Sequence, residues 1–220
     1  YEFALKNDIC NKDYSTFVEI AQYKDLNPNK HTRTKFAKEE VSKVWTMKDN
    51  KYYQIILMLL YNGTRISEFL DLKKGNVHLE EQYFDVINSK TENGIRKVPI
   101  ADKLLPYYKS WYDSCPDCEY LLHTDDRNRF LYRNYYDSYW TPLVEQIGID
   151  HTPHCTRRTC ISMLSEARVQ DTTIKKIAGH SGAMTLTEKV YTHLDMQVLV
   201  DAINKTLENK TTVIADAESA

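Results

Sequence analysis

An almost wholly apolar segment, Tyr52–Tyr61, constrains the fold of this chain more than any other feature. Its interior, Ile55–Leu60, is aliphatic apart from Met58. The segment is long enough for a buried core helix but far shorter than the roughly 20 residues that cross a bilayer. Asn62-Gly63 follows at once, and a glycine in this place is typical of a helix end. The sequence therefore predicts a globular domain with a buried helix and no membrane-spanning segment.

The composition places the chain among soluble globular domains. Of its 220 residues, 27% are charged and 42% are hydrophobic, a balance that excludes a disordered chain. Only six glycines are present and no Gly-x-Gly-x-x-Gly or Walker-type run occurs, so we expect no glycine-loop nucleotide site. The chain opens on Tyr1 without a charged-then-apolar leader, and we expect a piece of a longer cytoplasmic protein.

Hydrophobic periodicity predicts helices along most of the chain. Thr34 precedes apolar residues at helical spacing, which indicates a helix near 36–47, and Ser67 can cap a short helix after Gly63. Five aromatic residues within 132–147 are expected to pack in the core. The remaining helices are predicted at 102–113, 132–147, 156–168, 171–178 (ended by Gly179), 186–191 and 195–209.

Between these helices the pattern changes to alternation. Val77 and Leu79 alternate, Tyr83–Ile87 has the composition of a strand, and Asn93-Gly94 is a strong hairpin signal. Counting outward from a two-residue loop at Asn93-Gly94 pairs Glu92 with Ile95, Thr91 with Arg96 and Lys90 with Lys97. The expected fold class is mainly α with a small three-stranded antiparallel sheet (α+β), and Lys90 lies near the tip of that sheet.

Charge alone does not identify a partner. The formal net charge is −2, from 29 Lys and Arg against 31 Asp and Glu, which does not favour a polyanion binder as a whole. Each basic cluster taken alone is more typical of a solvated surface. The clusters are Lys30–Lys35, Lys73–Lys74, Arg127–Arg133, Arg157–Arg158 and Lys175–Lys176.

The five cysteines indicate no disulfide framework. Nothing suggests export, so reduced thiols are expected. Cys115-Pro-Asp-Cys118 has the spacing of half a zinc site and His123 is nearby, but no second Cys-x-x-Cys follows. We therefore expect no metal, and a zinc-based interaction module is the weakest functional alternative.

Three polar sites together match the needs of phosphodiester chemistry. Arg65 follows the apolar helix, His154 and Arg157 are three residues apart, and His180 and Tyr191 follow in order. Attack on a phosphodiester adds charge to the non-bridging oxygens, and two guanidiniums can clamp them without losing protons. A tyrosine, with an ordinary pKa near 10, needs a base or a positive field to become a nucleophile.

The motifs in this order resemble the catalytic domain of tyrosine site-specific recombinases, the integrases of phages and conjugative transposons. The resemblance covers about residues 36–207 and implies the tyrosine recombinase catalytic-domain fold. The motifs that carry it are Gly63-Thr64-Arg65-Ile66-Ser67-Glu68, Ser89-Lys90-Thr91 with Lys97-Val98-Pro99-Ile100, His154-Cys155-Thr156-Arg157, Gly179-His180, and Tyr191-Thr192-His193.

The resemblance implies a role for each matching residue. Tyr191 would attack the scissile phosphate and form a 3′-phosphotyrosyl bond, with Arg65 and Arg157 holding the non-bridging oxygens and His180 adding a hydrogen bond. Lys90 would protonate the leaving 5′-oxygen.

Two further residues complete the implied site. His154 would accept a proton near the tyrosine, and Glu68 would orient the other side chains rather than react. The covalent bond conserves the phosphodiester energy, so the reaction would need no ATP, metal or other cofactor.

The resemblance also implies partners and domain limits. The expected partner is double-stranded DNA at recombination sites, bound by a homotetramer with a possible excisionase or other accessory protein, in the cytoplasm and nucleoid of a bacterium. Residues 1–33 would end a preceding core-binding domain, 34–209 would be the catalytic domain, and 210–220 a flexible tail. The helix at 195–209 would dock on a neighbouring protomer, the alternative being packing on its own domain.

Two other functions stay open on the sequence. A topoisomerase IB-like cleaver would use the same nucleophile without synapsis, so the oligomeric state on DNA separates it from a recombinase. A DNA-binding module without catalysis is the second, and the complete set of catalytic positions argues against it.

Overall fold

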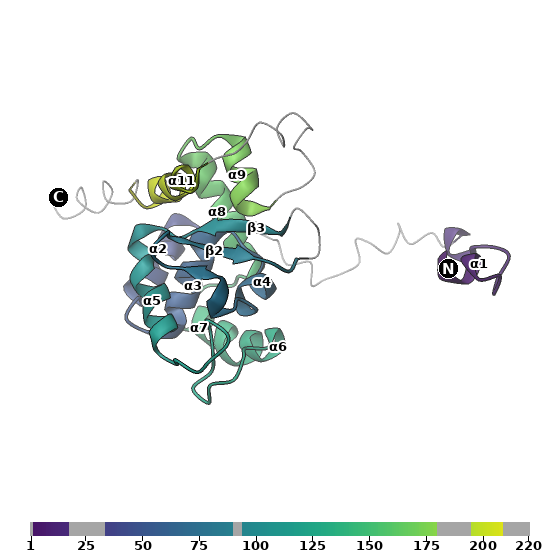
Figure 1. Cartoon of the computed structure of the whole chain (residues 1–220), viewed down its shortest axis with the longest axis horizontal. Coiled ribbons are helices and arrows are strands. Elements are labelled where there is room, and N and C mark those ends of the chain that lie inside the picture. The colour runs from purple at the N-terminus through teal and green to yellow at the C-terminus, as the bar shows by residue number, and fades with distance from the viewer. Residues whose placement is uncertain (1, 18–33, 90–93, 180–194, 209–220) are drawn as a thin grey trace. The chain divides into compact units, whose positions relative to one another are not determined.

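The computed structural model describes residues 2–17, 34–89, 94–179 and 195–208. The chain divides into two compact units, Tyr1–Thr32 and Arg33–Ala220. The first unit contains a short helix, α1 (Glu2–Lys6), and a 3₁₀ turn, η1 (Tyr14–Phe17). The second unit contains the sheet and all the other described helices (Figure 1), and every predicted site residue falls within its residue range.

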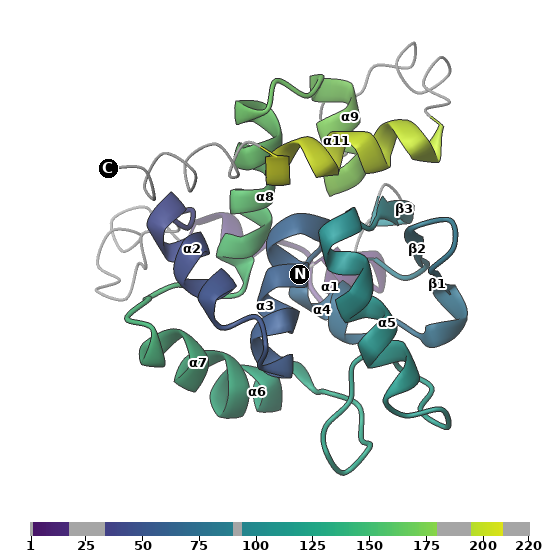
Figure 2. The ribbon, with the colours of Figure 1, turned by 90° about the vertical axis from the view of Figure 1, so that its left-hand side faces the viewer.

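Helix α3 (Lys51–Asn62) forms the core of the second unit, as the apolar segment predicts. Asn50 caps it by accepting the backbone N–H of Tyr52, and every side chain from Ile55 to Leu60 is fully buried. The helix ends at Gly63, whose φ of 64° is the left-handed conformation that glycine adopts without strain. Helices α2 (Lys38–Thr46) and α8 (His154–Glu166) pack against it (Figure 2).

The other predicted helices that fall on described residues are present. Segment 132–147 contains a π-helical turn between two α-helical turns. Among its aromatic residues, Tyr135 and Trp140 are buried in the core, whereas Tyr132 is 49% exposed. The elements are α4 (Ile66–Leu70), η3 (Lys74–Asn76), η5 (Asp102–Leu104), α5 (Leu105–Asp113), α6 (Tyr132–Tyr135), η6 (Tyr136–Trp140), α7 (Thr141–Gln146), α9 (Asp171–Ala178) and α11 (Met196–Glu208).

The sheet is a three-stranded antiparallel meander in the order β1 (Val77–His78), β2 (Tyr83–Val86), β3 (Arg96–Pro99), which confirms the predicted fold class. The predicted register is wrong. Arg96 pairs with Val86 and Lys97 with Asp85, so neither pairs with Thr91 or Lys90. Residues 87–95 therefore connect the two strands in place of a two-residue turn.

Helices pack on one face of this sheet and against its edge strand β3. Phe84 of β2 packs on Phe69 of α4 and Tyr108 of α5, with both ring centroids 6.0 Å away. β3, a strand at the edge of the sheet, contacts α9 and α11 (Figure 1). The sheet thus places the start of β3 between α4 and the end of α9.

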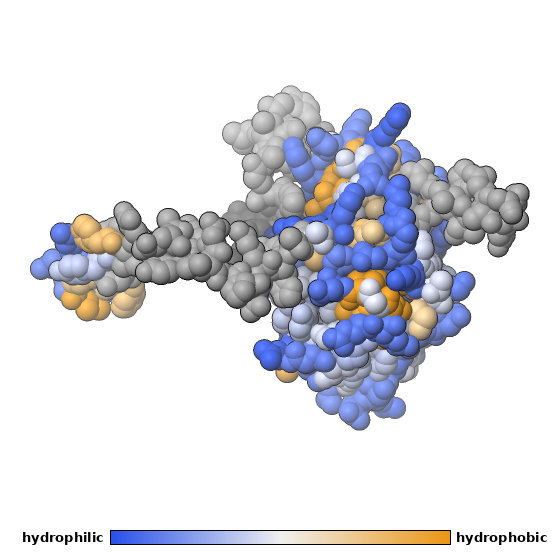
Figure 3. Space-filling model, turned by 180° about the vertical axis from the view of Figure 1, so that it is seen from behind, coloured by the Kyte–Doolittle hydropathy of each residue, from blue (hydrophilic) through white to orange (hydrophobic). Residues whose placement is uncertain are grey.

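Helix α11 packs on its own domain in this single chain, which is the alternative to the expected docking on a neighbouring protomer. It contacts α8, α9 and β3, and buries Leu199, Ile203 and Leu207. The helix predicted at 186–191 lies outside the described residues. Within the described ranges, no helix combines the length and apolar composition needed to span a membrane. Hydrophilic residues cover most of the face in Figure 3, with apolar residues in separate patches, as expected above a buried core.

Candidate active site

The turn after α3 fixes the position of Arg65. The side-chain oxygen of Asn62 accepts hydrogen bonds from the backbone N–H of Thr64 at 2.9 Å and from its hydroxyl at 2.8 Å. Thr64 is buried, and Arg65 follows as the residue that precedes α4. The Arg65 side chain, 31% exposed, is therefore held at the surface by a rigid buried turn.

Glu68 lies at the centre of the polar contacts and makes four of them. Its Oε1 accepts from Arg65 Nη1 at 2.6 Å and from Ser89 Oγ at 2.8 Å. Its Oε2 accepts from the Arg65 backbone N–H at 3.1 Å and from Arg96 Nη2 at 3.2 Å. The bond back to the Arg65 backbone is half of a capping box, so Arg65, rather than the expected Ser67, is the N-cap residue of helix α4.

These contacts keep the Glu68 carboxylate charged although its side chain is only 3% exposed. Burial alone would raise its pKa, but the charge of Arg96 and the hydrogen bonds from Arg65 and Ser89 lower the pKa below its ordinary value. The supporting position predicted for Glu68 thus coincides with an ionised, fully bonded carboxylate.

Arg96 belongs to this cluster and was missed by the sequence reasoning. Besides Glu68, it donates through Nη1 to the Gly94 carbonyl at 2.6 Å and through Nε to the Ile177 carbonyl at 2.8 Å. A signal was present, because Arg96 precedes the buried Val98 by two residues and strand alternation places both on one face. A charged side chain on a buried face is costly unless an opposite charge pairs with it, and Arg96 pairs with Glu68.

Arg157 is the third guanidinium of the cluster. It is 3% exposed and donates through Nη1 to the Gly63 carbonyl at 2.8 Å. Its Nη2 is buried and has no hydrogen-bond partner among the described residues. Burial, together with the charges of Arg96 and Arg65, lowers the pKa of Arg157 to about 10.

We name Arg65, Glu68, Arg96 and Arg157 the arginine cluster. Three guanidiniums face one carboxylate, so the cluster carries a surplus of positive charge. An unbonded, buried guanidinium N–H costs free energy unless an acceptor is supplied. The arrangement therefore fits an oxyanion, which guanidinium groups bind through paired hydrogen bonds.

The structure brings together three of the seven predicted site residues, namely Arg65, Glu68 and Arg157. His154 is the first residue of α8, one turn before Arg157, and is exposed. Lys90, His180 and Tyr191 lie outside the described residues.

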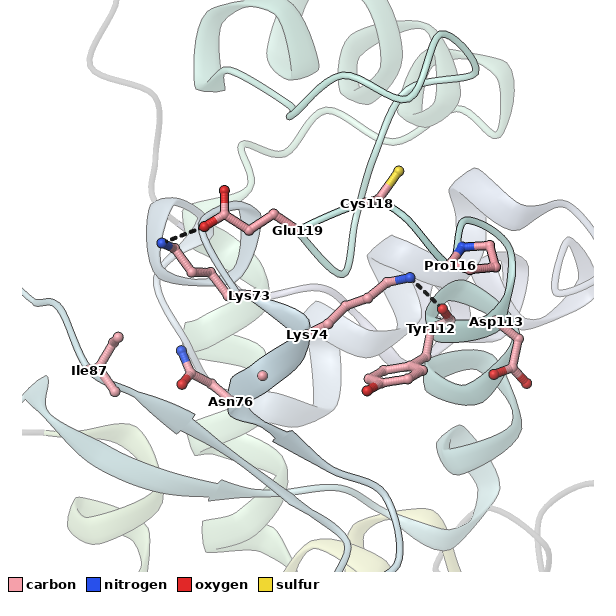
Figure 4. Close-up of a pocket in the computed structure, with 10 residues that line it drawn as sticks. Lys73, Lys74, Asn76, Ile87, Tyr112, Asp113, Pro116, Cys118 and Glu119 are labelled. Atoms are coloured by element: carbon pink, nitrogen blue, oxygen red, sulfur yellow. Dashed lines mark hydrogen bonds and ion pairs between the residues drawn. The ribbon is translucent and has the colours of Figure 1, made fainter.

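A second basic region lies elsewhere and differs from the arginine cluster. Lys73 and Lys74 line a pocket of about 680 Å³ that contains none of the predicted site residues (Figure 4). Lys73 pairs with Glu119 at 2.7 Å, and Lys74 donates to the carbonyls of Tyr112, at 2.5 Å, and Cys115. We name this region the lysine pocket, and both of its cations have partners within the chain.

The cysteine expectation needs a correction. Cys115 and Cys118 form a disulfide, because the turn between them holds their Cα atoms 5.4 Å apart. Their sulfurs and a His123 ring nitrogen lie within 4.8 Å of one another, but the disulfide occupies both sulfurs. Cys10, Cys155 and Cys160 are free.

Comparisons with known proteins agree with the geometry. Residues 34–198 match the model of the phage integrase family. The chain is 29% identical over 182 residues to the tyrosine recombinase XerA of Pyrococcus horikoshii, covering 76% of this chain and 59% of that protein. It is 30% identical to XerA of Thermococcus onnurineus, covering 76% and 61%. The chain thus spans about three fifths of the length of these relatives.

Solved structures show the same fold. A crystal structure of XerA recombinase matches with a TM-score of 0.59 and 25% identity, covering 79% of this chain and 63% of the other. The Tn1549 transposon integrase, solved with transposon right end DNA, matches with a TM-score of 0.64 and 18% identity, covering 90% and 72%. The resemblance to tyrosine recombinases is confirmed, and the chain belongs to the phage integrase family.

Proposed function

We propose that this chain is the catalytic part of a site-specific recombinase, which cuts and rejoins DNA strands through a 3′-phosphotyrosyl intermediate to integrate or excise a mobile element. One observation carries the proposal. The buried Nη2 of Arg157 lacks a partner among the described residues, beside two further guanidiniums that share a single carboxylate. A scissile phosphate would supply the missing acceptor and the missing negative charge.

The charge of the cluster suits the transition state better than the ground state. When a nucleophile attacks a phosphodiester, negative charge grows on the non-bridging oxygens, and preorganised donors stabilise it most. Even with a pKa of about 10, Arg157 keeps its proton at neutral pH. Arg65 stays directed by Glu68 and Ser89, so little reorganisation is needed when DNA binds.

The remaining roles rest on the motifs. Tyr191 is proposed as the nucleophile, Lys90 as the acid on the leaving 5′-oxygen, His180 as a hydrogen-bond donor to the phosphate, and His154 as the proton acceptor. The exposed position of His154, one helical turn before Arg157, is compatible with access to DNA. Chemistry of this kind needs no metal or ATP, because the phosphotyrosyl bond retains the energy of the broken phosphodiester.

The proposed partner is double-stranded DNA at recombination sites, and the Tn1549 integrase was solved in complex with transposon right end DNA. A homotetramer on DNA, with an excisionase or other accessory protein, is proposed for strand exchange in the bacterial cytoplasm and nucleoid. Residues 1–33 are proposed to end a DNA-binding domain that precedes the catalytic one, and 210–220 to be a flexible tail.

A covalent-trapping experiment tests the proposal. The chain is incubated with a nicked suicide substrate carrying the end sequence of the element that encodes it, at low salt, beside Tyr191→Phe. An SDS-resistant protein–DNA adduct in the wild type alone is the expected result. If neither this chain nor the full-length protein forms an adduct although both bind DNA, the proposed cleavage activity is contradicted. The chain would then be a DNA-binding module without catalysis.

A further inference from the structure

We infer that Arg96 is a positioning residue, which fixes Glu68, and through it Arg65, against the two chain segments that lead to Lys90 and His180. The inference rests on the proposed function and adds a residue to its site. Arg96 does not match any of the six catalytic positions of the motifs. Its side chain is 5% exposed, so its role follows from what it touches inside the protein.

Three nitrogen atoms of Arg96 bind three different segments. Nη2 reaches Glu68 on α4 at 3.2 Å, Nη1 reaches the carbonyl of Gly94 at the end of the β2–β3 connection, and Nε reaches the carbonyl of Ile177 in the last turn of α9. A planar guanidinium can hold three acceptors in fixed directions, whereas a lysine ammonium on a flexible stem cannot reproduce that geometry.

Gly179 supplies an independent observation that α9 ends against this guanidinium. A Cβ atom added to Gly179 would lie 2.9 Å from both Cδ and Nη1 of Arg96, closer than real Cβ contacts. The φ of 65° at Gly179 is also the left-handed conformation that disfavours other residues. A side chain at position 179 would therefore have to displace the Arg96 guanidinium from its present place.

The sequence connects these contacts to the reacting groups. Gly94 comes four residues after Lys90, and His180 directly follows Gly179. Arg96 also carries the second positive charge on Glu68, so Glu68 can orient Arg65 without neutralising the whole cluster. Without Arg96, the carboxylate would pair with Arg65 alone and both segments would lose their anchor.

The first test compares Arg96→Gln and Arg96→Lys with the wild type in single-turnover cleavage of fully bound DNA. Both variants should cleave about 100-fold more slowly, the loss expected for small misplacement of reacting groups. Their DNA affinity should stay within about threefold, because Arg96 is buried. Lys97→Gln is the matched control, since it removes a cation from the next position of β3 that faces Tyr83 and solvent. It should cleave at the wild-type rate.

Three outcomes of this test would overturn the inference. Full activity in Arg96→Lys would mean that charge alone suffices. A loss of DNA affinity equal to the loss of cleavage would mean that Arg96 only holds the fold. We expect the double variant Arg96→Gln/Glu68→Gln to cleave DNA no more slowly than the slower of the two single variants. If the losses in cleavage rate of the single variants instead add up in the double variant, the two residues act separately.

A readout without DNA keeps this test separate from the proposed function. In a carboxyl NMR titration, Arg96→Gln should raise the pKa of Glu68, because Arg96 is the largest of the charges that lower it. An unchanged pKa would overturn the inference. The wild type could form no adduct with DNA while the pKa of Glu68 is raised in Arg96→Gln. That result would contradict the proposed reaction and still support the linkage between Arg96 and Glu68.

Discussion

The arginine cluster and the lysine pocket are both basic in the sequence, but the structure uses their cations differently. In the lysine pocket, Lys73 has a carboxylate partner and Lys74 is bound by backbone carbonyls (Figure 4). In the arginine cluster, two guanidiniums share Glu68, and one buried nitrogen of the third, on Arg157, has no partner among the described residues. The first arrangement is internally satisfied, whereas the second leaves a buried donor that the proposed phosphate would bind.

This difference shows why a basic cluster in a sequence is weak evidence of function. An exposed ion pair such as Lys73–Glu119 contributes little to stability and leaves no charge for a ligand. A buried guanidinium beside others is costly, and a fold retains it where a ligand balances the cost. The number and burial of the partners separate the two cases, and both properties require the structure.

The largest expected effect is on the rate of DNA cleavage, and it distinguishes Arg157 from an arginine that is paired with a carboxylate of the same chain. Arg157→Ala should lower the rate of DNA cleavage by about 100- to 1,000-fold, as loss of a transition-state donor does. Arg129→Ala is the matched control, because Arg129 is 41% exposed and paired with Asp71 next to the lysine pocket. It should stay within about twofold. The rates are measured as covalent adduct formed on a suicide substrate.

Two results would break the comparison. Equal losses in the two variants would show that internal pairing does not separate functional from structural arginines. A wild-type rate in Arg157→Ala would remove Arg157 from the phosphate clamp. Near-ultraviolet circular dichroism of each variant checks that the fold is intact, and Arg157→Lys, which keeps the charge, is measured beside it.

A smaller effect is expected at two glycines, one in each region. Gly179→Ala should lower the free energy of unfolding by about 2 kcal/mol, because the left-handed backbone and the contact with Arg96 both oppose a Cβ atom. Gly75→Ala, beside Lys74 in the lysine pocket, should change it little, because a Cβ there meets nothing within 4 Å. Urea unfolding measures both, and similar values would contradict the close fit of α9 on Arg96.

Local sequence signals predicted most of the fold. The apolar run gave α3, and its glycine end was confirmed at Gly63. The predicted register of the hairpin was wrong because Asn93-Gly94 is a strong local signal for a two-residue turn. The observed pairing of Arg96 with Val86 depends instead on the packing of the whole sheet. The disulfide between Cys115 and Cys118 was missed because compartment arguments say nothing about local geometry.

The site was predictable where a motif places residues close in sequence. Arg65 is the N-cap of α4 and Glu68 lies three residues later on that helix, so their contact follows from local helix geometry. The link from Glu68 to Arg96 joins α4 to β3, and the link from Arg157 to Gly63 joins α8 to the end of α3. Such contacts depend on tertiary structure, so the sequence names the residues but not their partners.

The smallest expected effect is a pH dependence that sharpens the contrast between Glu68 and an exposed carboxylate. The pKa of Glu68 is lowered in the fold, so its ionised form stabilises the protein above the ordinary value of 4.5, and this stabilisation is lost as the pH falls through the lower folded pKa. The free energies of unfolding of wild type and Glu68→Gln should therefore differ near pH 6 and converge towards pH 3 in urea titrations. Glu119→Gln, in the lysine pocket, should follow the wild type throughout, since Glu119 is 61% exposed. Parallel curves for wild type and Glu68→Gln would show that the charge of Glu68 contributes nothing to the cluster.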